Sequence, residues 1–478
     1  MPEKNHPNVL LLIADQWRGD CLGVAGHPDV KTPFLDTLAG QGIRFENAYS
    51  ATPSCIPARA AVLTGMRQEH HGRVGYKDGV SWRYENTLPG CFAQAGYQTH
   101  CAGKMHVHPL RARLGFESID LHDGFLHYYN NAHVPHYTHQ NVADDYCHFM
   151  EGQGHKALTD TGLECNGWPA RPWMYDEALH PTHWVADKTI DFLRRRERER
   201  PFFLTASFVR PHPPLDAPEA YFAPYRNKAL RPPIAGGDWE EPIGPTNFNS
   251  SHGIPDAEYI RQAQQGYYAC ITQADHQMGR IIEAVKAEGE WENTVVMFIS
   301  DHGEMLGDHN LFRKAVPYEG STHVPMLLAG PGVSRGMVRQ DVAELRDVMP
   351  TLLAATGLNI PGTVDGENLL AGPAQREWIH GEHAYGELSN HYLVTDRDKY
   401  IWFSQTGEER YFDLATDPDE LHNAVDDARC HERVTWLRRE MIRVLDGREE
   451  GYSDGTQLVT GPTPQTIFSF LQPFVTTW

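Results

Sequence analysis

Short, uninterrupted runs of apolar residues recur along the first 300 positions, and polar, chemically reactive residues directly follow each of them. The runs are 8–14, 97–102, 202–208 and 294–300. Apolar runs of this length are typical of parallel strands that are buried on both faces. Segments with helical periodicity lie between them, at 34–41, 89–95, 182–196 and 258–288. The alternation predicts an α/β fold: a large mixed, mostly parallel sheet sandwiched by helices.

The pattern changes after about residue 365, where glycines and prolines become more frequent and the apolar runs become shorter. Alternating runs occupy 378–383, 391–395, 399–403 and 411–414, and a helical pattern covers 429–445. Short alternating runs are typical of an antiparallel sheet with one solvated face. We therefore predict a catalytic α/β domain at 1–365 and a smaller α+β domain at 366–478. The last residues, from 451, predict an irregular tail that packs on a surface.

Composition and charge narrow the class of protein. Hydrophobic residues make up 40% of the 478 residues and charged residues 22%, as in a packed globular protein. The formal net charge of −21 argues against a nucleic-acid partner, which would require a basic surface. No stretch approaches the ~18 apolar residues of a membrane span. The amino-terminal segment lacks a basic region ahead of its short apolar run, and the eight cysteines show no CxxC spacing. We therefore expect a cytoplasmic enzyme with reduced thiols.

The residues after the apolar runs are the first candidates for chemistry. Asp15 and Gln16 follow the first run, and Asp301 and His302 follow the last. The second run is followed by Gly-Lys-Met-His at 103–106, and the third by Arg-Pro-His at 210–212. In an open α/β sheet, ligands bind beyond the carboxyl ends of the strands. Residues far apart in the sequence are therefore predicted to meet at one edge of the sheet.

Cys55 begins a second candidate motif, Cys-Ile-Pro-Ala-Arg at 55–59. Pro57 suits the first position of a helix, and Gly65 is placed to end that helix. Cys55 would then lie just ahead of a helix amino terminus, where backbone N–H groups favour an anion. Taken alone, the motif is equally compatible with a buried structural cysteine.

The order of motifs along the chain resembles that of the type I sulfatases, members of the alkaline phosphatase superfamily. The matching segments are 31–39, 55–65, 103–106, 211–213, 300–304 with Lys314, 318–319, and Asp347 with 350–351. They occur in the family's order and extend over about 8–362. The resemblance implies an alkaline phosphatase-like sheet and a sulfuric ester hydrolase.

The resemblance also implies a modified cysteine. In the family, a separate maturation enzyme oxidises the motif cysteine to Cα-formylglycine (3-oxoalanine), which implies the same modification of Cys55. Its hydrate presents two hydroxyls. One attacks sulfur in line with activation by a metal, and the other collapses to the aldehyde and expels sulfate. An unmodified thiol could not carry out that second step.

The resemblance further implies a single divalent metal ion, held by Asp15, Gln16, Asp301, His302 and the residue made from Cys55. Many family members carry Asp where Gln16 stands and Asn where His302 stands. The Gln/His pairing is closer to the choline-sulfatase and phosphonate monoester hydrolase branch. Ca²⁺ ranks first by resemblance, and the imidazole nitrogen makes Mn²⁺ the alternative.

Five further residues match family positions with catalytic roles. Arg59 lies one helical turn from Cys55 and is expected to hold the hydrated aldehyde. Lys104 and Lys314 match lysines that neutralise the sulfate oxygens. His106 matches the residue that accepts a proton when the aldehyde is regenerated, and His212 matches a general acid or sulfate contact.

The predicted substrate is a small sulfated molecule, such as a sulfated sugar or an aryl sulfate. Two alternatives stay open: a phosphonate monoester or phosphodiester hydrolase, and a catalytically inactive metal-binding relative. Retention of the Gly-Lys-x-His motif favours sulfate esters over phosphonates. Specificity is expected from the loops 68–82, 121–139 and 211–249, whose aromatic residues suit stacking on a ring. The aromatic tail at 468–478 suits packing on its own chain or on a second copy in a homo-oligomer.

Overall fold

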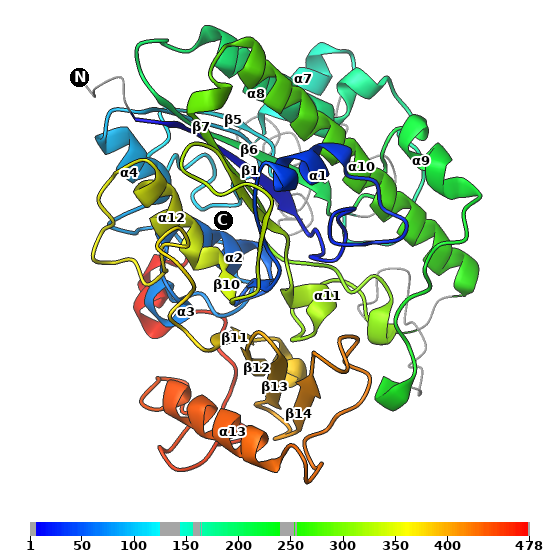
Figure 1. Cartoon of the computed structure of the whole chain (residues 1–478), viewed down its shortest axis with the longest axis vertical. Helices are drawn as coiled ribbons and strands as arrows, with labels where there is room; N and C mark the ends of the chain where they lie inside the picture. The colour runs from blue at the N-terminus through cyan, green and yellow to red at the C-terminus, as the bar shows by residue number, and fades with distance from the viewer. Residues whose placement is uncertain are drawn as a thin grey trace.

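The computed structural model describes residues 6–124, 144–155, 163, 165–239, 253 and 256–476. Figure 1 shows a twisted central sheet with helices on both sides and a smaller unit of sheet and helix below it. The predicted loop 121–139 lies outside these residues from position 125 on, and so does the loop 211–249 from position 240 on.

The central sheet has eight strands in a mixed arrangement. In spatial order they are β5 (Ser118–Leu121), β4 (Gln98–Gly103), β6 (Phe202–Pro211), β1 (Asn8–Asp15), β7 (Thr294–Ser300), β8 (Met326–Ala329), β2 (Gly42–Phe45) and β9 (Met337–Arg339). The strands from β5 to β7 are parallel to one another, whereas β8 is antiparallel to both of its neighbours. The long apolar strands β6, β1 and β7 lie in the middle, where both faces are covered.

Alternate residues of β1 point to opposite faces and enter two different cores. Leu10 and Leu12 pack in the core under the helices on one face, and Leu11 and Ile13 pack under those on the other. The first face carries α1 (Pro33–Gly40), α7 (Asp145–Gly152), α8 (Pro181–Arg195), α9 (Glu219–Arg226) and α10 (Ala257–Ala287). The second carries α2 (Cys55–Thr64), α4 (Leu88–Gln94) and α12 (Val348–Ala355) (Figure 1). The predicted sandwich of a mostly parallel sheet between helices is confirmed.

The C-terminal part forms a four-stranded antiparallel sheet in the order β11 (Ile379–His383), β12 (Asn390–Val394), β13 (Asp398–Phe403) and β14 (Glu409–Asp413). One face packs on α13 (His431–Leu445) through Leu393 and Trp402, as predicted. The other face packs on the catalytic part, where Tyr392 lies in one cluster with Tyr49. The domain boundary between residues 365 and 366 stays a prediction, because this shared core joins the two parts.

Short connecting elements complete the description. In the described residues they are β3 (Ala48–Tyr49) paired with β10 (Ala343–Glu344), and the short helices α3 (Gln68–His71) and α11 (Glu319–Thr322). The described residues also form the 3₁₀ turns η1 (Glu177–Leu179), η2 (Gly237–Trp239), η3 (Trp291–Asn293), η4 (Asp308–Asn310), η5 (Leu345–Asp347), η6 (Gly386–Leu388) and η7 (Ser469–Phe474).

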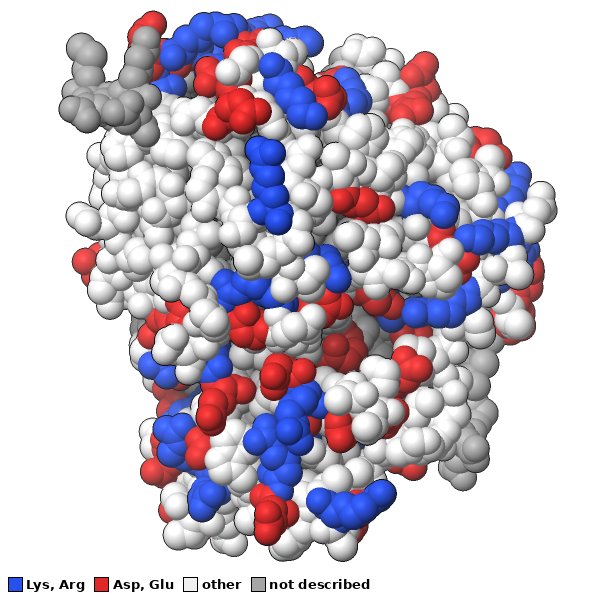
Figure 2. Space-filling model, viewed as in Figure 1, with Lys and Arg blue, Asp and Glu red and all other residues white. Residues whose placement is uncertain are grey.

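The tail packs on its own chain. Ile467 bridges to Arg73, and Val475 bridges to Val80, so that the last described residues return to the loop after α3. Acidic and basic side chains are interspersed over the face shown in Figure 2, which has no continuous basic surface. Of the helices in the described parts of the chain, none has the length and apolarity needed to cross a bilayer.

Candidate active site

The carboxyl ends of the central strands bring the two predicted acids together. Because Ala14 pairs with Ser300 in register, Asp15 and Asp301 leave adjacent parallel strands at the same level. Backbone N–H groups of Gln16 and His302 donate to Asp301 Oδ1 at 3.1 and 3.0 Å, which fixes the orientation of that carboxylate. Both acids are fully buried. The predicted meeting of distant residues at one edge of the sheet is therefore what the structure shows.

Cys55 faces these acids from the second helical layer. It is the first residue of α2, so the helix begins two residues before the predicted Pro57, and it ends at Gly65 in the left-handed conformation, as predicted. Cys55 Sγ lies 3.6 Å from Asp15 Oδ1 and 3.3 Å from His302 Nε2. Burial raises the pKa of the thiol, and so does Asp15, but the cations Lys104 and Lys314, with His302, hold the pKa of Cys55 well below its ordinary value.

Asp15, Cys55, Asp301 and His302 form a set of donors suited to a divalent cation. Their ligand atoms all lie within 4.8 Å of one another, and His302 Nε2 is 3.7 and 3.6 Å from the nearer oxygens of Asp15 and Asp301. Burial and the neighbouring Asp15 raise the pKa of Asp301 to about 6. A cation between the two carboxylates would relieve this repulsion. The residues present therefore fit the divalent metal that the family implies.

Two buried cations hold the acids from behind. The Arg59 guanidinium donates to Asp301 Oδ2 at 3.0 Å and to Asp15 Oδ2 at 3.3 Å. Its Nη1 donates to the carbonyl of Lys104 at 2.8 Å, which ties α2 to the end of β4. Lys104 Nζ lies 2.5 Å from Asp15 Oδ2. Burial lowers the pKa of Lys104, but Asp15 and Cys55 raise it above its ordinary value, so the site keeps this positive charge.

Gln16 and Lys314 lie next to the acids. The Lys314 ammonium donates to the Gln16 side-chain oxygen, and the Gln16 amide nitrogen donates to Glu304 Oε2. Gln16 adopts the left-handed conformation (φ 69°), which turns the chain sharply after β1. The predicted metal role of Gln16 stays a prediction, since its oxygen contacts Lys314 in this structure.

His106 lies beside two acids that the sequence analysis did not select. Its Nε2 is 3.6 Å from Asp78 Oδ1, and its backbone N–H donates to Asp123 Oδ1 at 2.8 Å. Burial and Lys104 lower the pKa of His106, but hydrogen bonds to Asp78 and Cys55 outweigh them and raise it to about 9. Asp78 and Asp123 are ordinary loop acids in the sequence, and only the fold shows that they orient a histidine.

His212 is positioned by the chain rather than by an acid. Its backbone N–H donates to the carbonyl of Asp15 at 3.0 Å, and its Nδ1 contacts the carbonyl of Pro213 at 2.9 Å. Its Nε2 is buried and has no hydrogen-bond partner among the described residues. Burial and Lys314 hold the pKa of His212 well below its ordinary value, so the ring is neutral.

A pocket of about 470 Å³ opens above Cys55 between the two parts of the chain. From the catalytic part it is lined by Ser54, Cys55, Tyr76, Asn166, His212, Arg313, Lys314 and Ala315. From the C-terminal part it is lined by His383, Ala384, Tyr385, Gly386 and Thr466. The sequence analysis missed the second group, although His383 stands at the carboxyl end of a predicted strand. His383 Nε2 contacts Ser54 Oγ at 2.8 Å, directly before the reactive cysteine.

Two of the three loops that were predicted to set specificity contribute residues to this pocket. Tyr76 comes from the predicted loop 68–82, and His212 from the loop 211–249. Of the candidate catalytic residues, Cys55, His212 and Lys314 line the pocket, whereas Arg59 and Lys104 lie behind it as ion partners of the acids.

Paired acids at the edge of a parallel sheet, a cysteine at a helix amino terminus and cations around the pocket suit a hydrolase of anionic esters that uses a metal. The family model described as sulfatase matches residues 7–358, and a model described as the C-terminal part of N-sulphoglucosamine sulphohydrolase matches residues 307–446. The chain belongs to the sulfatase family, and it is a sulfuric ester hydrolase.

Individual relatives agree with this assignment. An arylsulfatase of Clostridium perfringens (strain 13 / Type A) is 50% identical over 477 residues, which cover 96% of this chain and 99% of the relative. The structure of the phosphonate monoester hydrolase of Agrobacterium radiobacter superposes with a TM-score of 0.73 at 26% identity, covering 92% of this chain and 95% of that one. A protein solved with its substrate D-glucosamine-2-N,6-O-disulfate superposes with a TM-score of 0.71 at 19% identity, covering 92% and 97%, and shares the fold.

Proposed function

We propose that this sulfatase works through a formylglycine made from Cys55 by a maturation enzyme, together with one divalent metal ion. The observation that carries the proposal is the position of Cys55, 3.3 Å from His302 and 3.6 Å from Asp15 at the base of a cationic pocket. The hydrated aldehyde and the metal together supply an activated hydroxyl for attack on sulfur. The metal ligands are Asp15, Gln16, Asp301, His302 and the modified Cys55.

The cations of the site bind and orient the sulfate group. Lys314 lines the pocket next to Cys55, and Lys104 lies on its inner side against Asp15. Both are placed to neutralise charge on the sulfate oxygens through the transition state, where a buried cation stabilises more than an exposed one. Arg59 contacts both Asp15 and Asp301 and so keeps together the two carboxylates that would hold the metal.

Two histidines handle protons. A sulfate ester next to His212 Nε2 places negative charge beside a neutral imidazole and so favours its protonated form, which can give a proton to the departing alcohol. His106 accepts the proton released when the aldehyde is regenerated, and Asp78 orients its ring. Maturation of Cys55 removes the thiol hydrogen bond that helps to raise the pKa of His106.

The proposed substrate is a small sulfate ester, either an aryl sulfate or a sulfated sugar. The arylsulfatase relative supports the first, and the neighbour that binds a disulfated glucosamine motivates the second. Tyr76 and Tyr385 at the pocket suit a ring. We propose Ca²⁺ as the metal, with Mn²⁺ as the alternative because of the nitrogen ligand. None of the eight cysteines forms a disulfide, which supports the proposal of a reducing, cytoplasmic location.

A second candidate activity is the hydrolysis of phosphonate monoesters or phosphodiesters, which the likeness to a phosphonate monoester hydrolase favours. The test compares kcat/KM for sulfate, phosphonate and phosphodiester substrates that share one leaving group. We expect the sulfate ester to react fastest, and a preference for either phosphorus ester would assign the second activity. Intact-mass measurement on the same preparation should show Cys55 lighter by about 18 Da, the mass change from thiol to aldehyde. A full-mass thiol in active enzyme would contradict the proposed nucleophile.

A further inference from the structure

The C-terminal sheet holds a second buried cluster of ligating side chains, away from the catalytic pocket. His380 and Glu382 lie on β11, and His391 lies on β12. Glu382 pairs with His391 across the antiparallel ladder, and His380 lies two residues before Glu382, so all three side chains share one face of the sheet. That face is the one covered by α13, as shown by the packing of Leu393 and Trp402.

The spacing within this cluster matches that of the catalytic donors. His380 Nε2 lies 3.3 Å from His391 Nδ1, and His391 Nδ1 lies 3.7 Å from Glu382 Oε2. At the catalytic centre the corresponding separations run from 3.3 to 3.7 Å. Two ligands bonded to zinc at 2.0–2.1 Å in tetrahedral geometry are about 3.3 Å apart. Both clusters therefore have the dimensions of a metal site.

The surroundings restrain the three side chains. The His391 ring stacks on Trp402 with centroids 5.7 Å apart, and Tyr452 meets it edge-on at 5.0 Å. Arg448 Nη2 donates to Glu382 Oε2 at 2.7 Å, which fixes the carboxylate in the way that an outer partner orients a metal ligand. Glu382 Oε1 is buried and has no hydrogen-bond partner among the described residues. A buried carboxylate oxygen without a donor is costly unless a cation satisfies it.

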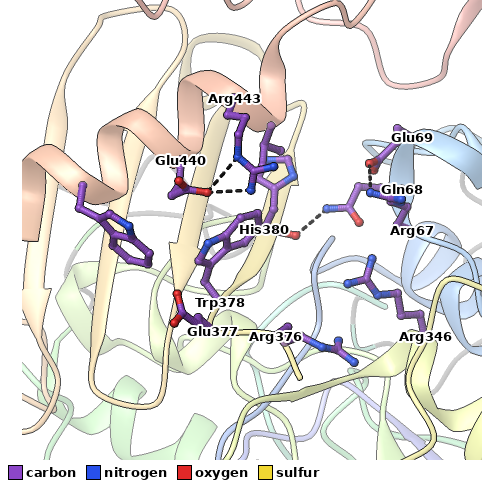
Figure 3. A pocket seen from close by; sticks show the side chains of 12 residues that line it. Arg67, Gln68, Glu69, Arg346, Arg376, Glu377, Trp378, His380, Glu440 and Arg443 are labelled. Carbon is purple, nitrogen blue, oxygen red and sulfur yellow. Dashed lines mark hydrogen bonds and ion pairs between the residues drawn. The ribbon is translucent and has the colours of Figure 1, made fainter. Parts of the chain in front are cut away.

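One member of the cluster, His380, lines a pocket of about 400 Å³ at the junction of the two parts of the chain. Figure 3 shows His380 on its wall, beside Trp378 and opposite Gln68, whose amide donates to the His380 carbonyl at 2.7 Å. A water can complete a fourth position on the side of His380, the member of the cluster that lines this pocket.

We propose that His380, Glu382 and His391 form a zinc site that fixes β11 to β12. Two imidazoles and one carboxylate are ligands that suit Zn²⁺, whereas Ca²⁺ and Mg²⁺ prefer sites made mostly of oxygen donors. The site is structural rather than catalytic, because Trp402 and Tyr452 pack on His391 and because Arg448, the cation beside it, is bound by Glu382 and Glu450. It acts on the active site through β11, whose last residue, His383, reaches Ser54 and the catalytic pocket.

The experiment measures zinc in the full-length enzyme. Protein saturated with Ca²⁺, so that the catalytic centre is occupied, is equilibrated with micromolar Zn²⁺, desalted and analysed by elemental mass spectrometry. We expect one zinc per chain, retained in Asp301→Asn but lost in His391→Gln and His380→Gln. His71→Gln is the matched control, because His71 is equally buried but lies in neither cluster, and it should keep its zinc.

A spectroscopic measurement on the wild-type enzyme tests the proposal without relying on variants, which could fail to fold. Titration of the Ca²⁺-loaded wild-type enzyme with Co²⁺ should give the visible absorption of a four-coordinate site, and Zn²⁺ should abolish it and raise Tm. Substoichiometric zinc and no such absorption in the wild-type enzyme would show that His380 and His391 only share a hydrogen bond, which overturns the proposal. Zinc lost from Asp301→Asn but kept in His391→Gln would place the ion at the catalytic centre instead. Neither readout depends on sulfatase turnover.

Discussion

At the catalytic centre, the contact between Cys55 and His302 joins residues that are 247 positions apart in the sequence, whereas in the C-terminal sheet the contact between His380 and His391 joins residues 11 positions apart. The first set forms only when β1, α2 and β7 are all in place. The second needs one hairpin. A centre built from distant segments depends on the whole fold, and a cluster on adjacent strands depends on the local sheet.

The charges around the two clusters also differ. Lys104, Lys314 and Arg59 surround the catalytic acids, so the site holds positive charge for which a sulfate ester is the natural partner. Around the second cluster, the rings of Trp402 and Tyr452 pack on His391, and Arg448 is balanced by Glu382 and Glu450. Similar ligand spacing therefore serves anion chemistry in one place and the stability of the sheet in the other.

The largest expected effect is a loss of turnover caused by a change at the catalytic centre alone. Cys55→Ala removes the proposed nucleophile and should lower kcat by roughly 10⁴-fold or more. The fold should persist, because only a small side chain is removed. Turnover of an aryl sulfate and thermal unfolding would be measured on the same samples, with zinc content as a third readout. Activity within tenfold of the wild-type value would rule out the assigned nucleophile.

A smaller loss is expected when one sulfate-binding cation is removed. Lys314→Ala should lower kcat/KM by about 10²–10³-fold, because a preorganised charge at the developing anion is lost. Lys77→Ala removes an exposed lysine that follows the pocket residue Tyr76, and as the control it should leave kcat/KM unchanged. Equal effects of the two substitutions would mean that the net charge of the protein, rather than a contact between Lys314 and the sulfate group, affects the reaction.

The largest loss of unfolding free energy is expected from a substitution in the C-terminal part, at Arg448. Arg448 is the buried partner of Glu382 and Glu450, at 2.7 and 2.6 Å. Arg448→Met leaves these carboxylates without their cation and should cost about 3–5 kcal/mol of unfolding free energy. Urea denaturation measures the loss, and kcat per folded molecule at low denaturant should stay close to the wild-type value. A large fall in kcat with unchanged stability would instead make Arg448 part of the catalytic apparatus.

The smallest expected effect is a displacement of the pH profile. His106 accepts a proton only when its ring is neutral, so kcat falls as the pH drops through its pKa. Asp78→Asn removes a carboxylate that raises this pKa. The acidic limb of kcat against pH should therefore move by about one unit to lower pH. A profile that keeps its position would show that another group carries this proton.

The long buried strands could be predicted because each apolar run is long enough to indicate a strand without help from its neighbours. Asp15, Asp301 and Cys55 could be assigned to the site through the motifs that contain them. The strands β8, β2 and β9 were not predicted, since each has only three or four residues. His383 and Tyr385 were assigned to a separate domain, and nothing in a local pattern shows that β11 reaches the catalytic pocket. Asp78 was missed for the same reason, because its relation to His106 exists only in three dimensions.

The return of the tail to the loop after α3 has a consequence for the time course of biosynthesis. Thr466 lines the catalytic pocket and Ile467 bridges to Arg73, so the pocket is incomplete until these two residues have emerged from the ribosome. At typical synthesis rates, roughly 20–80 s separate the emergence of Cys55 from that of Thr466. In the finished fold Cys55 is only 1% exposed. We therefore expect the proposed maturation enzyme to act on Cys55 during translation, before the residues around Thr466 complete the wall of the pocket.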